Sequence, residues 1–311
     1  MYFHEKRLQY PVKVENPDPV YARMLQQAIG GIEGEIRVCL QYFFQGWGNR
    51  SPNTKYRDVL LNTATEEIGH IEMLATAVAL NLEGAPASLQ ETAAAASPVM
   101  NAVMGGGERP RHAVEGMLHR HILSTGMAAF PANCDGVPFD CSHVYASGNI
   151  VGDMFANVAA EATGRTLAVR LFNAAHDKGM QDMWRFLIAR DTMHQQQWLA
   201  IVDELGGLTE GLPVPNSFDQ NEELKEFSYA FFGTERNGTP VQPGRYSQGP
   251  SLDGKGEYHF VQAEPLGAEP VLGPARPDSG AQKEQMSEPP TTPACAAEAG
   301  RRGRPRLGRP R

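Results

Sequence analysis

Four stretches of the sequence that are otherwise apolar carry acids or histidines at spacings suited to metal binding. Two of them hold an acid followed by a histidine at the third position after it, and the other two hold one glutamate each. In chain order the residues are Glu35, Glu67 with His70, Glu161, and Asp191 with His194. Residues three apart on a helix share a face, so each pair presents its acid and imidazole together. Because an unpaired buried charge is costly, each residue requires a partner.

Carboxylates and imidazoles in this combination favour a site for two metal ions. Carboxylate oxygens bridge hard or borderline cations, imidazoles bind at the two ends, and open coordination positions remain for a small substrate. Ferritin-like dimetal proteins use a Glu from each of two helices and a Glu-x-x-His from each of the other two. This chain differs at one place, where Asp191 replaces a glutamate. The lack of cysteine in the pattern disfavours a closed structural zinc site.

Apolar periodicity and helix stop signals predict the elements that position these residues. Four long helices are expected, over residues 19–47, 54–82, 150–175 and 180–205. Short turns join each pair of helices, and residues 83–149 connect the two pairs. This order predicts an all-α, ferritin-like four-helix bundle with a long crossover connection. The crossover is too long for a structureless loop, so a shorter helix is expected over residues 113–123.

The remainder of the chain predicts arms and a tail around the bundle. We expect an N-terminal arm over residues 1–18, the bundle over 19–210, and an extended C-terminal arm over 211–276 with a strand-like piece at 257–262. Proline, glycine and polar residues increase along the C-terminal arm. Residues 277–311 end in a Pro/Gly/Arg run that cannot bury apolar surface, and we expect them to be disordered.

Composition excludes several classes of protein. The formal net charge of -8 argues against binding to nucleic acid or to anionic membranes, because both would repel the chain. Charged residues interrupt residues 1–14, where a secretory signal needs an apolar stretch, and no apolar run is long enough for a transmembrane helix. The four cysteines form no C-x-x-C pair, which indicates a reducing compartment. A cytoplasmic protein is expected.

The segments around the metal-binding residues resemble the four signature helices of the manganese catalase family. These segments are residues 30–44, 65–73, 159–161 and 189–195, and residues 246–256 resemble the carboxy-terminal arm of that family. The resemblance implies two manganese ions per subunit that disproportionate hydrogen peroxide. It implies the metal ligands Glu35, Glu67, His70, Glu161 and His194. Glu35 is expected to bridge the ions, with Glu67 and Glu161 at opposite ends.

The same resemblance implies roles for residues that do not bind manganese. Tyr42 is expected to hydrogen-bond around the cluster, although a tyrosine in the core is the alternative interpretation. Asp191 occupies the position of a glutamate that handles protons in some family members. Asp58 matches a calcium site of some members, but Asn62 stands where a second acid would help. A homo-hexamer is implied, with the C-terminal arm as the expected subunit contact.

The sequence leaves alternatives open. A single Glu-x-x-His is as typical of an exposed ion pair as of a metal site. Glu66 competes with Glu67 for the ligand position, and the spacing to His70 favours Glu67, which places Glu66 outside the ligand set or at the surface. Ligand types alone do not separate manganese from iron. A di-iron ferroxidase or peroxidase is therefore the leading alternative function, and a coat or storage protein that has lost its metal is another.

Overall fold

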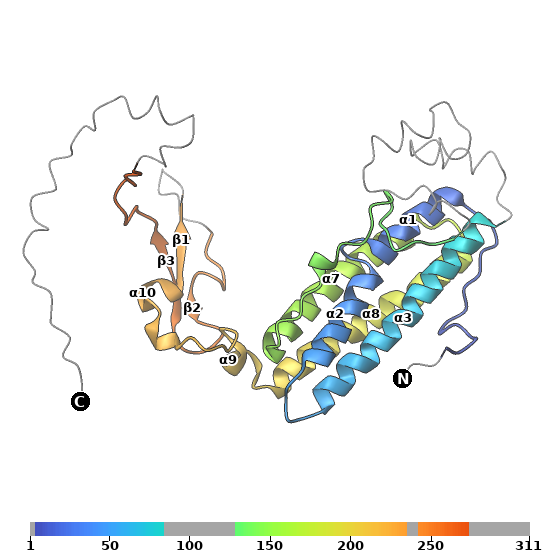
Figure 1. The fold of residues 1–311 in the computed structure, drawn as a ribbon. Coiled ribbons are helices and arrows are strands. Elements are labelled where there is room, and N and C mark those ends of the chain that lie inside the picture. Colours follow the sequence, from blue (N-terminus) through green and yellow to red (C-terminus); the bar gives the residue numbers. More distant parts are fainter. Residues whose placement is uncertain (1–3, 84–127, 235–241, 274–311) are drawn as a thin grey trace, which may run out of the picture. The chain divides into compact units, whose positions relative to one another are not determined.

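The helical part of the chain is a bundle of antiparallel neighbours. The computed structural model describes residues 4–83, 128–234 and 242–273. The long described helices are α1 (Pro19–Gly30), α2 (Glu35–Gly48), α3 (Lys55–Leu82), α7 (Ile150–Ala174) and α8 (Lys178–Glu204). Helix α2 packs against α3 and α7 packs against α8 (Figure 1). The predicted all-α bundle with two helix pairs is confirmed.

The first predicted helix is wrong in one respect, because residues 19–47 form two helices. Helix α1 ends at Gly30 and α2 begins at Glu35. A Cβ atom on Gly30 would lie 2.5 Å from the backbone nitrogen of Ala132, so only glycine allows this approach. The break makes Glu35 the first residue of α2, at the positive end of the helix dipole.

The other three predicted helices agree with the structure to within two residues at each end. Asp177 begins α8 by accepting the backbone N–H groups of Gly179 and Met180. Its second oxygen accepts the backbone N–H groups of Glu15 and Asn16 at 2.8 and 2.9 Å. One buried carboxylate therefore caps the last bundle helix and also holds the N-terminal arm against it.

Two apolar clusters fill the bundle, and polar residues lie between them. On α3, Leu60 of one cluster precedes Glu67 and His70, and Met73 of the other cluster follows them. Along α8 the two clusters follow in the reverse order, with Leu187 before and Trp198 after the acidic and imidazole side chains. A polar site enclosed by apolar side chains along two helices excludes water and strengthens electrostatic interactions within it.

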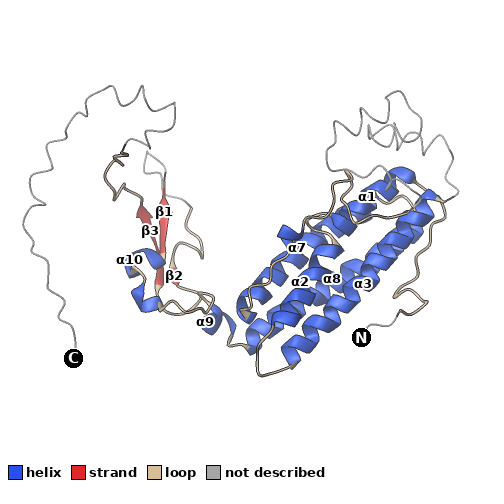
Figure 2. Cartoon of the chain, viewed as in Figure 1, coloured by secondary structure: helices blue, strands red, loops and turns tan. Residues whose placement is uncertain are grey.

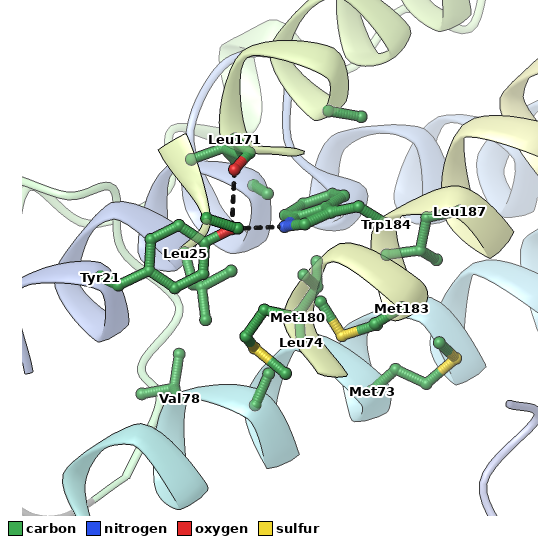
Figure 3. Close-up of a cluster of buried hydrophobic side chains, with 14 of the residues drawn as sticks. Tyr21, Leu25, Met73, Leu74, Val78, Leu171, Met180, Met183, Trp184 and Leu187 are labelled. Atoms are coloured by element: carbon green, nitrogen blue, oxygen red, sulfur yellow. Dashed lines mark hydrogen bonds between the residues drawn. The ribbon is translucent and has the colours of Figure 1, made fainter. Parts of the chain in front are cut away.

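Within the cluster that contains Met73, Tyr21 joins two other helices through its hydroxyl group (Figure 3). The hydroxyl donates to the backbone oxygen of Leu171 at 2.8 Å and accepts the indole N–H of Trp184 at 2.7 Å. A tyrosine between an indole and a carbonyl group satisfies polar atoms that would otherwise be buried without a partner.

Replacement of Tyr21 by phenylalanine is expected to lower the free energy of unfolding by about 1–3 kcal/mol, because the indole N–H of Trp184 stays buried without an acceptor. Denaturant unfolding in identical buffer and metal conditions measures this change. Tyr246→Phe is the matched control, since its exposed hydroxyl donates to the Gln242 carbonyl and water replaces it easily. Equal losses in the two variants would contradict the prediction.

The segment after the bundle is short of helix and contains a small sheet (Figure 2). It includes α9 (Gly207–Gly211), α10 (Lys225–Ser228), β1 (Ala230–Gly233), β2 (Gly249–Pro250) and β3 (Glu257–Gln262). The strand order is β1-β3-β2, and β2 runs antiparallel to β3 with Gly249 opposite Tyr258. The predicted strand at residues 257–262 is confirmed.

Contacts divide the chain into one unit of residues 1–231 and 240–260 and a second unit of residues 232–239 and 261–311. The helix expected over residues 113–123 and the tail over 277–311 lie outside the described residues. Among the helices that are described, none combines the length and apolar character needed to span a bilayer.

Candidate metal centre

The five predicted metal ligands come together in two groups inside the bundle. Glu35, Glu67 and His70 form one group, and Glu67, Glu161 and His194 form the other. Within each group the donor atoms lie within 4.8 Å of one another. The four residues other than Glu35 are buried, and Glu35 is half-buried. Each group therefore offers two carboxylates and one imidazole, the first group from α2 and α3 and the second from α3, α7 and α8.

Glu67 belongs to both groups and directs one oxygen to each. Its Oε2 atom lies 2.6 Å from Nδ1 of His70, and its Oε1 atom lies 3.0 Å from Nδ1 of His194. Glu35 approaches Nδ1 of His70 at 3.8 Å, and Glu161 approaches Nδ1 of His194 at 3.5 Å. Glu35 approaches one imidazole and Glu67 approaches both, and the bridging role expected of Glu35 stays a prediction. The shared position is that of Glu67.

The buried donor atoms of this centre fit metal ions. Both oxygens of Glu67 and both ring nitrogens of His70 and His194 are buried and make no hydrogen bond. Buried polar atoms in folded proteins are almost always hydrogen bonded, so atoms without a partner require another explanation. Two cations would satisfy the Glu67 oxygens and one nitrogen of each imidazole, and mixed carboxylate and imidazole donors suit manganese or iron.

The electrostatic environment separates the pKa values of these groups. Burial raises the pKa of Glu35 to about 7. Burial acts in the same direction on Glu67, but the imidazoles outweigh it and lower the pKa of Glu67 to about 2. Burial lowers the pKa of a histidine, but the surrounding carboxylates raise that of His194 to about 12 and that of His70 well above its usual value. Both imidazoles therefore bind protons at neutral pH unless a metal ion competes for the nitrogens.

Tyr42 and Asp191 lie around the two groups without belonging to either. Tyr42 is fully buried and donates its hydroxyl hydrogen bond to Oε1 of Glu161. Burial, followed by the charge of Glu161, raises the pKa of Tyr42 well above its usual value, so the hydroxyl remains a donor. Asp191 is buried, and burial followed by the charge of Glu35 raises its pKa well above the usual range. Burial and the neighbouring acids thus favour the protonated form of the Asp191 carboxyl group.

Asp58, the residue predicted for calcium, lies apart from these groups. It is exposed in the first turn of α3 and belongs to neither metal-binding group of the described residues. Calcium binding stays a prediction.

A buried amide cluster beside the site was not predicted from the sequence. Asn157 accepts hydrogen bonds from Gln41 and Gln45, each at 2.8 Å, and returns one to Gln45 at 2.8 Å. Gln41 adjoins Tyr42 on α2, and Asn157 precedes Glu161 by one turn of α7. The cluster therefore fixes α2 against α7 where Tyr42 meets Glu161. The signal in the sequence was two glutamines four residues apart within an apolar helix.

The fold and the donor set define a class, the ferritin-like proteins that hold two metal ions among four helices with carboxylates and imidazoles. A family model described as manganese containing catalase matches residues 1–302. The chain belongs to this manganese-containing catalase family.

Individual relatives agree with this assignment. A manganese catalase of Bacillus subtilis (strain 168) is 42% identical over 277 residues, which cover 89% of this chain and 96% of the relative. A manganese catalase of Lactiplantibacillus plantarum is 32% identical over 278 residues, which cover 89% and 97%. The crystal structure of KatB, a manganese catalase from Anabaena PCC7120, has the same fold with a TM-score of 0.63 at 22% identity and covers 85% of this chain and 100% of that one.

Proposed function

We propose that this chain disproportionates hydrogen peroxide at a dimanganese centre held by the two groups that share Glu67. Disproportionation of hydrogen peroxide is the function of its family. The observation that carries the proposal is the buried Glu67 carboxylate, which has one oxygen toward His70 and the other toward His194. The ligands proposed for manganese are Glu35, Glu67, His70, Glu161 and His194.

When bound, two manganese ions supply the two-electron change that the reaction needs, since the oxidation state of each ion changes by one unit. One hydrogen peroxide gives up two electrons and two protons and leaves as oxygen. A second hydrogen peroxide takes up two electrons and two protons, its O–O bond breaks, and two water molecules form. Protons released by the first molecule must therefore be held until the second arrives.

Residues of this chain hold the protons and position the metal ligands. We assign proton storage to the carboxyl group of Asp191, which is buried near the cluster and belongs to neither ligand group. Bound cations lower the pKa of nearby carboxyl groups, which places Asp191 closer to the balance between its two forms. Tyr42 orients Glu161 through its hydroxyl hydrogen bond. The apolar clusters on both sides keep water away from the reacting atoms.

Metal analysis of the purified protein, combined with oxygen release from hydrogen peroxide in the presence of azide, tests the function. We expect about two manganese ions per chain and azide-tolerant oxygen release, because the donor set forms two groups. Two irons per chain without oxygen release would support the ferroxidase or peroxidase alternative. A protein that binds no metal on reconstitution would support the coat or storage alternative.

Binding of manganese is expected to release about two protons per chain near neutral pH, because His70 and His194 bind protons there and the metal needs their neutral form. Both histidine pKa values are raised, so proton competition weakens as the pH rises toward them, and manganese affinity should increase with pH. Calorimetric titration in two buffers of different ionisation heat counts the protons. An affinity that is unchanged between about pH 6 and about pH 8 would contradict this expectation.

We also propose a homo-hexamer in which the arm of residues 211–276 contacts neighbouring subunits around the bundle of residues 19–210. Support comes from large apolar side chains exposed on single chains, among them Phe44 at 52%, Trp47 at 49% and Leu224 at 67%. Phe44 and Trp47 are in edge-to-face contact on α2, and an exposed apolar patch is typical of protein interfaces. Light scattering should give six times the 34.0 kDa mass of one chain. A mass of one or two chains would contradict the proposal.

A further inference from the structure

Glu66 lies on the opposite side of both imidazoles from Glu67, although the two residues are neighbours in sequence. Glu67 approaches the Nδ1 atoms, as described above. The Nε2 atom of His70 lies 3.6 Å from Oε1 of Glu66, and the Nε2 atom of His194 lies 3.3 Å from Oε2 of Glu66. In the part of the chain that the structure describes, no other acid is within 4.0 Å of either Nε2 atom. Each imidazole therefore lies between the carboxylates of Glu66 and Glu67, and the two imidazoles share both carboxylates.

The Glu66 carboxylate is held in place from two directions. Arg190 of α8 donates to Oε1 from Nε at 2.6 Å and to Oε2 from Nη2 at 3.3 Å. This two-pronged contact is the strong geometry of an arginine and a carboxylate. Gln9 of the N-terminal arm donates to Oε1 at 3.2 Å. The arm comes this close because Gly69 has no side chain, and a Cβ atom there would lie 3.0 Å from Oε1 of Gln9.

The Nε2 atoms of His70 and His194 are buried and lack a hydrogen bond, so they need an acceptor. A histidine that binds a metal through one nitrogen almost always donates its other N–H to a carboxylate, a carbonyl or water, which fixes the tautomer and the ring orientation. The distances to Glu66 exceed a normal hydrogen bond by a few tenths of an ångström. A small rotation of each ring would bring both atoms within hydrogen-bond distance of Glu66.

We propose that Glu66 is a positioning residue for both imidazole ligands, its two oxygens accepting the Nε2–H groups of His70 and His194 while their Nδ1 atoms face the metal. The inference rests on the proposed function, since it requires metal at the Nδ1 atoms. The Glu66 carboxylate, on the side away from the metal, thus controls the orientation of the imidazole ring at each end of the centre. Arg190 completes the arrangement by occupying both oxygens of Glu66, which keeps this acid from binding metal in place of Glu67.

Release of manganese from the full-length holoprotein to increasing chelator concentrations tests the inference. Glu66→Gln keeps the size of the side chain but removes its charge and one acceptor oxygen. Manganese affinity is expected to weaken about 10–100-fold at both metal positions. Glu72→Gln is the matched control, because Glu72 is on the same helix, its side chain is 41% exposed and it pairs with His4 at the surface. The control should retain wild-type affinity.

A second variant, Arg190→Lys, decides the question if Glu66→Gln does not fold. Lysine keeps the charge but loses the two-pronged grip, so an affinity between those of wild type and Glu66→Gln is expected. Wild-type manganese affinity in the folded variants, even with a lower melting temperature, would show that the pair of Glu66 and Arg190 only joins α3 to α8 and would overturn the inference. The proposed function would stand in that case if the wild type carries manganese and releases oxygen. A wild type without manganese would overturn both.

Discussion

Glutamine in place of Glu67 is expected to empty both metal positions and to lower oxygen release by more than about 100-fold. Loss of a hydrogen-bond partner of a metal ligand already lowers metal affinity or activity about 10–100-fold. Loss of a ligand shared by two ions must lower them further. The amide of glutamine has one oxygen instead of two equivalent ones, and it carries no charge to neutralise two cations. Glu67 is the residue whose two oxygens face both imidazoles.

Manganese content per chain and oxygen release, measured on the same preparation, check this prediction. Glu35→Gln provides an internal comparison because Glu35 belongs to one group, and its loss should mainly affect one ion. Glu72→Gln, an exposed change on the same helix, should leave both quantities unchanged. If Glu67→Gln retained one ion while Glu35→Gln lost both, the shared position would belong to Glu35, as expected from the family resemblance.

Asparagine in place of Asp191 is expected to lower kcat about 10²–10⁴-fold while about two manganese ions per chain remain bound. An amide has the size of the carboxyl group but cannot take up and return a proton. The buried carboxyl group of Asp191 has a strongly raised pKa, because burial and the nearby charge of Glu35 both favour its protonated form. A group that holds a proton inside a dry site suits a reaction that releases protons and then consumes them.

Oxygen-electrode kinetics together with metal analysis separate the possible roles of Asp191. Asp191→Glu is the matched variant, since it restores a carboxyl group on a side chain one methylene longer, and it should recover much of the lost kcat. Loss of manganese in Asp191→Asn would make this residue a ligand. Full activity in Asp191→Asn would place proton storage on another group.

The bundle and its ligand set were predictable because both leave strong local signals. Apolar periodicity defined three of the long helices to within two residues, and acids or histidines inside such patterns are rare unless they are paired. The break between α1 and α2 is not predicted because the apolar spacing continues through it, and the backbone of Ala132, which approaches Gly30, comes from the distant crossover segment. Periodicity within one helix carries no information about such a contact.

The division of roles between adjacent carboxylates could not be read from the sequence either. Spacing placed Glu67 on the face of His70, but it did not show that its oxygens reach two imidazoles on different helices. The sequence places Glu66 either outside the ligand set or at the surface, and its contact with Arg190 depends on how α3 and α8 pack. Side-chain orientation across helices is set by tertiary packing, whereas spacing along one helix is local.

The contact between Asp177 and the N-terminal arm has a consequence for the order in which the protein assembles. Glu15 leaves the ribosome early, but its hydrogen-bond partner Asp177 follows 162 residues later. Domains form from the N-terminus onward during synthesis, and contacts between distant residues form late because closing a long loop costs entropy. The arm must therefore wait for the start of α8 before it docks. The same arm carries Gln9, which donates to Glu66 beside the centre, so docking of the arm brings this hydrogen bond with it.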